Sequence, residues 1–239
     1  MNSTATGLYR AGLYGKVPAH GDFIDRGLPG SFINVWDDWL QRSVASSREV
    51  LGESWLDYYL TSPIWRFVLA PGAVDNGTRA GVLLPSVDSV GRYFPLTIAA
   101  AVDNKVNTFS FLAEQEDWFS QLENAALAAL QESLPVDELM QRLAGLPMPA
   151  HSASQTLHKS DSLVTGTAVV ATGEPALPAG CYNQLLQQFT QARLSSYSLW
   201  WCNGSDHMQP TLLLAPGLPN AQGYTALLDG QWQQWGWML

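Results

Sequence analysis

A run of seven residues, Leu96–Val102 with the sequence LTIAAAV, places the strongest constraint on the fold of this chain. Nearly every position in the run is apolar, so a strand formed here needs cover on both of its faces. A strand with one face in water would alternate between polar and apolar residues instead. We therefore expect this run to be a central strand of an α/β domain that carries helices on both faces of its sheet.

Other segments show strand-like or helix-like patterns that alternate along the chain. Turn-forming residues at 71–72, 76–77 and 88–92 separate three neighbouring strand-like runs and predict a meander. Strands are expected at 12–16, 64–70, 81–85, 94–102, 163–171, 196–202 and 212–215, and helices at 32–51, 53–60, 112–132, 137–144, 181–194 and 221–228. The fold class predicted is a three-layer α/β/α sandwich with a mixed, partly antiparallel sheet.

The helix expected at 32–51 has Ser31 as its predicted N-cap, because a serine hydroxyl can accept a hydrogen bond from the first turn. Apolar residues recur along it at helical spacing. Four tryptophans in this part of the chain occupy positions that suit core-facing stripes: Trp36, Trp39, Trp55 and Trp65. We expect all four in the core.

The chain has 239 residues, a length that allows one large domain or two small ones. The segment 145–162 is rich in Pro, Ser and His and predicts a loop. We interpret it as a surface crossover within a single domain that spans 1–239, with a frayed start at about 1–7.

The charge balance argues against several classes of partner. The net charge is −9, and no run of Lys and Arg forms a basic patch, so we expect neither nucleic-acid binding nor attraction to an anionic membrane. No apolar stretch is long enough to span a membrane, and the N-terminus does not resemble a signal peptide. A cytoplasmic protein is therefore expected, in which Cys181 and Cys202 are buried free thiols.

The sequence contains none of the common catalytic motifs considered next. The chain has no phosphate-binding loop, no dinucleotide-binding fingerprint and no nucleophile elbow. Its four histidines lack the spacing of a metal site, so we expect no metal and no cofactor. A hydrolase built on Ser86, His20 and Asp88 remains an alternative, with Asp22 in the same group of loops. The competing interpretation is that these side chains bond to nearby backbone amides in turns.

Three cations lie beside turns or strands in this acidic chain: Lys16, Arg66 and Arg92. They would form either a small-anion or phosphopeptide-binding site, with Asp22 and Asp88 as orienting partners, or an internal ion-pair network that fixes the loops. Trp232, Trp235 and Trp237 pose a similar choice, since they would either dock back on the body or form an exposed anchor patch for a partner.

Four long blocks of sequence resemble, in their order, the TagF family associated with bacterial type VI secretion systems. They are GKVPAHGDF at 15–23, WDDWLQ at 36–41, SPIWRFVLAPG at 62–72 and GVLLPSVDSVGRYFPL at 81–96. The likeness covers about 7–102 block by block and continues more loosely through SLWW at 198–201.

The resemblance implies a three-layer α/β sandwich and an accessory protein that restrains secretion post-translationally. It implies action by binding the forkhead-associated scaffold protein that promotes assembly, without enzymatic activity. Some relatives are fused to a PP2C-type phosphatase; this chain ends at Leu239 without such an extension, so we expect no phosphatase activity. The family offers no catalytic residues to transfer, and the motif positions are candidates for a binding surface or a structural cluster: Lys16, His20, Asp22, Arg66, Ser86, Asp88 and Arg92.

Overall fold

The computed structural model describes residues 10–147 and 181–237, and within them seven strands form one sheet. Their order across the sheet is β2-β1-β5-β4-β3-β6-β7. Every described pairing is antiparallel, so the parallel pairs that a mixed sheet requires do not occur among these strands. The strands are β1 (Gly12–Gly15), β2 (Ile24–Arg26), β3 (Trp65–Leu69), β4 (Thr78–Leu84), β5 (Leu96–Val102), β6 (Tyr197–Cys202) and β7 (Thr211–Pro216).

The run that constrained the fold is β5, and it lies between β1 and β4 inside the sheet. Its side chains alternate between two separate cores. Leu96, Ile98 and Ala100 pack into one hydrophobic cluster, whereas Ala99 packs into the other. Thr97 faces the second cluster too, where its hydroxyl accepts a 2.8 Å hydrogen bond from Trp36 Nε1. The prediction of a central strand covered on both faces is confirmed.

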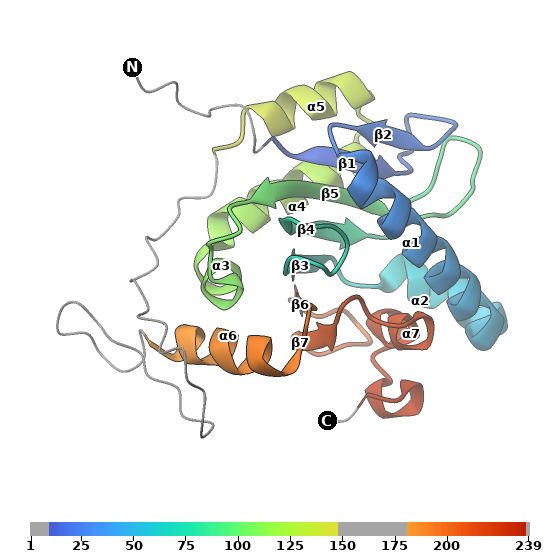
Figure 1. Cartoon of the computed structure of the whole chain (residues 1–239). Coiled ribbons are helices and arrows are strands. Elements are labelled where there is room, and N and C mark those ends of the chain that lie inside the picture. Colours follow the sequence, from blue (N-terminus) through green and yellow to red (C-terminus); the bar gives the residue numbers. More distant parts are fainter. Residues whose placement is uncertain (1–9, 148–180, 238–239) are drawn as a thin grey trace, which may run out of the picture.

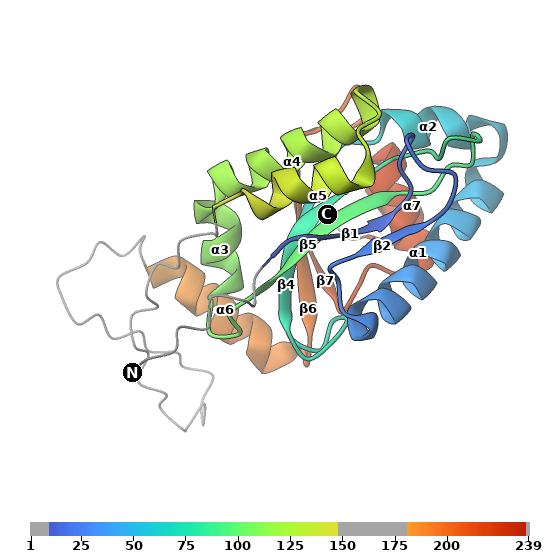
Figure 2. The same cartoon turned by 90° about the horizontal axis from the view of Figure 1, so that it is seen from above.

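One face of the sheet is covered by α1 (Gly30–Leu51), α2 (Trp55–Thr61) and α7 (Ala221–Asp229), as Figures 1 and 2 show. A short 3-10 turn, η1 (Gly52–Ser54), joins α1 to α2. The layer is held by aromatic side chains, and all four tryptophans expected in the core are buried. Trp36 stacks against Phe32 and Trp200, with ring centroids 5.1 and 6.1 Å away.

The opposite face is covered by α3 (Thr108–Glu114), α4 (Glu116–Gln131) and α5 (Val136–Ala144), with α6 (Tyr182–Arg193) beside α3 (Figure 2). Apolar positions on α4 recur at helical spacing and pack on the sheet, among them Trp118, Phe119 and Leu122. The sheet thus lies between two helical layers, in agreement with the predicted sandwich.

The structure differs from the predicted helix boundaries in two regions of the chain. Helix α1 begins at Gly30 after Pro29, and the Ser31 hydroxyl donates to Asp75 Oδ2 instead of capping the helix. The single helix expected at 112–132 is two helices, because the chain leaves helical geometry at Gln115. Helix α3 starts earlier than expected, where the Asn107 side chain accepts hydrogen bonds from the backbone N–H groups of Phe109 and Ser110.

Other expectations were incomplete. The short edge strand β2 was not predicted, and β4 begins at Thr78, before the expected start at 81. The expected strand at 163–171 and most of the expected loop at 145–162 lie outside the described residues. Cys202 is a buried free thiol as expected, whereas Cys181 is a free thiol that is only partly buried.

Candidate functional site

The site begins where β1 ends, because backbone geometry there brings two loops together. Gly15 has a φ of +124°, and a Cβ at this position would lie 2.0 Å from the carbonyl oxygen of Pro95. A side chain would therefore prevent β1 from approaching the segment before β5. The close approach positions the loop 16–23 beside the loop 85–95, which joins β4 to β5.

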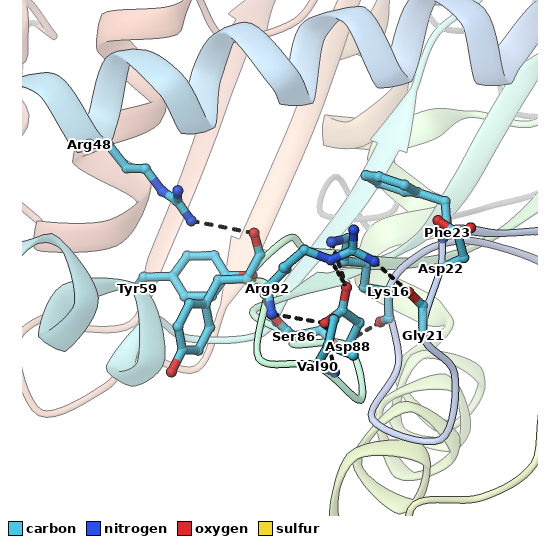
Figure 3. A network of polar contacts seen from close by, with 11 residues as sticks. Lys16, Gly21, Asp22, Phe23, Arg48, Tyr59, Ser86, Asp88, Val90 and Arg92 are labelled. Atoms are coloured by element: carbon cyan, nitrogen blue, oxygen red, sulfur yellow. Dashed lines mark hydrogen bonds and ion pairs between the residues drawn. The ribbon is translucent and has the colours of Figure 1, made fainter.

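Asp88 is the centre of the polar contacts in these loops (Figure 3). Its Oδ2 accepts hydrogen bonds from Lys16 Nζ at 2.8 Å and Arg92 Nε at 2.7 Å. Its Oδ1 accepts from the backbone N–H groups of Val90 and Arg92, at 3.1 and 2.8 Å. Lys16 and Asp88 are both buried, so this carboxylate compensates a lysine charge removed from water.

The electrostatics of Asp88 follow from these contacts. Burial would raise the pKa of the carboxyl, but hydrogen bonds from Lys16 and Arg92 outweigh burial and hold that pKa far below its ordinary value. Asp88 is therefore ionised at neutral pH, with its oxygens engaged in the loop.

Ser86 is buried and tied to backbone groups on two sides. Its hydroxyl donates to the carbonyl of Lys16 at 2.6 Å, which links the two loops directly. Tyr59 on α2 supplies a second link, because its hydroxyl donates to the Ser86 carbonyl and accepts from the Ser86 N–H, both at 2.9 Å. Burial raises the pKa of Tyr59 well above its ordinary value, so the phenol keeps the proton that it donates.

His20 and Asp22 lie in the same pair of loops but are exposed. The His20 carbonyl accepts from Ser89 N–H at 3.0 Å, and Asp22 Oδ1 accepts from the N–H of Phe23 at 3.2 Å. Among the described residues, no hydrogen bond joins the His20 ring to Ser86 or Asp88. The contacts that a Ser-His-Asp grouping needs are thus not made here, since Ser86 and Asp88 are both engaged elsewhere.

Arg66 is separate from this site. It extends from β3 toward α4, where it donates to Glu123 Oε1 at 2.6 Å and to both carboxylate oxygens of Glu116. Its side chain is 3% exposed. The three cations considered together in the sequence therefore belong to two networks, with Lys16 and Arg92 at Asp88 and Arg66 on the α4 side of the sheet.

The three tail tryptophans contact the body and are each partly buried. Trp232, in the 3-10 turn η3 (Trp232–Trp235), meets Trp65 edge to face at 6.2 Å. Trp235 Nε1 donates to Asp229 Oδ2 at 2.7 Å, and Trp237 Nε1 donates to the Gly223 carbonyl at 3.2 Å. The docked arrangement is the one observed, with part of each ring still accessible.

A separate groove of about 320 Å³ lies between α3, α6 and the sheet. Its lining is mainly apolar, from side chains such as Leu112, Leu186 and Trp201. The acidic residue in the lining is Glu116, and hydrogen bonds from Arg66 lower its pKa. In the ranges 10–147 and 181–237, no group of His, Cys, Asp and Glu side chains could hold a metal ion, and no helix is long and apolar enough to cross a membrane.

Comparison with known protein families gives a match over residues 12–146 to the TagF N-terminal domain, described as type VI secretion system-associated. The matched region covers more than half of the chain. The chain belongs to the TagF family.

A search of solved structures agrees with the TagF assignment in fold and extent. The chain is similar to PA0076 from Pseudomonas aeruginosa PAO1, with 35% identity and a TM-score of 0.77. The alignment covers 92% of this chain and 94% of PA0076. No curated protein matches the chain.

The TagF motif blocks have distinct places in this structure. The blocks at 15–23 and 81–96 meet at Asp88, as the hydrogen bonds of Lys16 and Arg92 show. The block at 62–72 supplies Arg66 to the α4 layer, and the tryptophans of the block at 36–41 lie in the core of the α1 layer.

Sequence reasoning missed several partners of these residues. Tyr59 falls within the helix expected at 53–60, and nothing in the neighbouring sequence signals a hydrogen bond to Ser86. The acidic partners of Arg66 had a detectable signal, because Glu116, Ser120 and Glu123 recur at helical spacing on one face of α4. That pattern predicts a polar stripe that a buried cation would satisfy.

Proposed function

We propose that this TagF-family chain is a non-enzymatic, post-translational negative regulator of type VI secretion that acts in the cytoplasm by binding the forkhead-associated scaffold protein. The observation that carries this proposal is family membership over residues 12–146, which associates the chain with the secretion system. The engagement of Ser86 and Asp88 in structural hydrogen bonds is consistent with a role without catalysis.

Repression by this route requires only binding. A protein that binds the scaffold and withholds it from assembly shifts the assembly equilibrium by its differential binding free energy. No covalent change in the scaffold is needed, so repression would be independent of whether the scaffold is phosphorylated.

Isothermal titration of the purified chain with the purified scaffold protein, in phosphorylated and unphosphorylated forms, tests the proposal. We expect clear binding of similar affinity to both forms. In cells, deletion of this chain in a strain that expresses the scaffold should increase secretion. Failure of both forms to bind, or unchanged secretion in the deletion strain, would contradict the proposal.

A further inference from the structure

Among the side chains that the two motif loops expose near the buried Asp88 are Phe23, Val90 and Arg92 (Figure 3). We call these three residues the motif-loop face. Phe23 and Val90 are 43% and 68% exposed, and the Arg92 side chain is 56% exposed. Aromatic residues and arginine are enriched in protein interfaces, and this face presents one of each in Phe23 and Arg92.

The guanidinium of Arg92 is held in place despite its exposure. Its Nε donates to Asp88 and its Nη2 donates to the carbonyl of Gly21. Asp88 is itself fixed by Lys16 and by two backbone N–H groups. An exposed arginine normally loses much side-chain freedom when it binds a partner, and here the network has already removed that freedom.

The guanidinium keeps donor capacity for a further group. Its Nη1 makes no hydrogen bond to any residue in the two described ranges, although an arginine has five N–H donors. Among the described residues, Lys16 Nζ donates one hydrogen bond, to Asp88, and it lies 4.9 Å from the centre of the Phe23 ring. Two cations thus share one buried carboxylate, and the second positive charge is balanced by the exposed Asp22 of the same loop.

The neighbouring charges select the kind of anion. Asp22 is exposed in the same loop and offsets the excess positive charge at the rim of the face. A doubly charged phosphate would be repelled by both Asp22 and Asp88. A single carboxylate carries less charge and can accept hydrogen bonds from Nη1 of Arg92. A partner that places an apolar side chain next to that carboxylate would cover Phe23 and Val90 as well.

We infer that the motif-loop face binds a protein partner through an aspartate or glutamate of the partner that Arg92 receives, with an apolar partner side chain against Phe23 and Val90. The inference rests on the proposed function, because the partner used to test it is the scaffold protein. Beyond the proposed function, the inference specifies which surface of this chain binds the partner and which kinds of side chain form the contact.

The test is titration of the scaffold protein with the full chain carrying Arg92→Ala, Val90→Glu or Val90→Lys. Arg92→Ala should weaken binding at least about tenfold. Val90→Glu should weaken it by a similar factor, because it removes the apolar contact and its charge repels the partner carboxylate, and Val90→Lys should weaken it less at low salt, because the lysine attracts that carboxylate. The difference between the two Val90 variants should shrink at high salt.

Two matched controls lie on the exposed side of α1. Arg42→Ala removes a positive charge from an exposed pair with Asp38, and Val50→Glu adds a negative charge at a site 45% exposed. Neither should change binding. If wild type binds and the Arg92 and Val90 variants bind equally well, or if the two Val90 variants weaken binding equally, this inference is wrong while the proposed function stands. If wild type does not bind, both fail.

Discussion

At the scale of single residues, the candidate site is held by buried polar groups whose partners lie far away in sequence. Tyr59 bonds to the backbone of Ser86, and Lys16 bonds to Asp88. Water cannot replace a lost partner at a buried site, so the cost of removing one is the desolvation penalty of the group left behind. The loops therefore depend on a few specific atoms.

Tyr59→Phe tests this dependence. The change removes one hydroxyl and leaves the buried N–H and C=O of Ser86 without that partner, so we expect a loss of about 1–3 kcal/mol in the free energy of unfolding. Denaturant titration measures it. Tyr58→Phe, at the next position on α2, alters a partly buried ring that makes no hydrogen bond through its hydroxyl to the described residues, and it should be nearly neutral. Equal effects would contradict the assigned role.

The ionisation of Asp88 predicts a pH dependence of stability. The folded state holds the pKa of Asp88 below its unfolded value of about 4, so the unfolded state takes up the proton first as the pH falls. The stability that Asp88 contributes is complete above that unfolded pKa and is lost as the pH falls toward the folded pKa.

We expect denaturant titrations between pH 7 and pH 3 to show this loss for the wild type and a flatter profile for Asp88→Asn. Asp38→Asn, in an exposed pair with Arg42, should follow the wild-type profile. An Asp88→Asn profile parallel to that of the wild type would show that Asp88 does not carry this dependence.

At the scale of helices and strands, hydrogen bonds at helix N-termini fix starting points that the spacing of apolar residues does not define. Asn107 caps α3 through two backbone N–H groups, whereas Ser31 lies inside α1 and bonds to Asp75. Both residue types are good caps in isolation, so residue identity alone could not distinguish them.

Asn107→Ala should therefore cost about 1 kcal/mol in the free energy of unfolding, because it removes the acceptor for two N–H groups of α3. Ser31→Ala should cost much less, since its 3.4 Å bond to Asp75 is exposed. Thermal or denaturant unfolding of the two variants gives the comparison. A larger loss for Ser31→Ala would mean that the serine, as its sequence position suggested, is the true cap.

The link between β3 and α4 depends on Arg66. Arg66→Met should destabilise the fold by about 3 kcal/mol, because it leaves Glu123, with a side chain only 18% exposed, without its cation. Glu116→Gln should cost at most about 1 kcal/mol, because the Glu116 side chain is 66% exposed and water can solvate it. Unfolding free energies of both variants check the order, and the reverse order would contradict this account.

At the scale of the whole molecule, one sheet serves two cores. Each strand inside the sheet directs alternate side chains to the α1 layer and to the α4 layer. The two helical layers therefore pack on opposite faces of the same strands. This arrangement supports the expectation of a single domain and favours cooperative unfolding.

Unfolding should therefore give one transition with the same midpoint for both layers. Five buried tryptophans lie in the α1 layer, and Trp118 lies in the α4 layer. Fluorescence of a Trp118→Phe variant would report mainly on the α1 layer, and circular dichroism would report on all helices. Two transitions, or midpoints that differ between the probes, would show that the layers unfold separately and would contradict the single domain.

Apolar periodicity by itself determined the main elements of this protein, because burial requires a hydrophobic stripe on each helix and two apolar faces on a covered strand. The apolar run Leu96–Val102 predicted a strand inside the sheet. The spacing of Trp36 and Trp39 predicted which face of α1 packs on the core. The order of the motif blocks also indicated the family.

Only the tertiary structure decided which polar residues meet. Lys16 and Asp88 join across 72 positions in the sequence, whereas Arg66, of similar local character, turns to the other side of the sheet. Side-chain alternation sets the face to which each residue points, but the strand order that brings distant residues together is not encoded near them. Hydrophobic burial can be predicted locally from the spacing of apolar residues, but a hydrogen bond between distant residues exists only once the fold has brought its donor and acceptor within hydrogen-bonding distance.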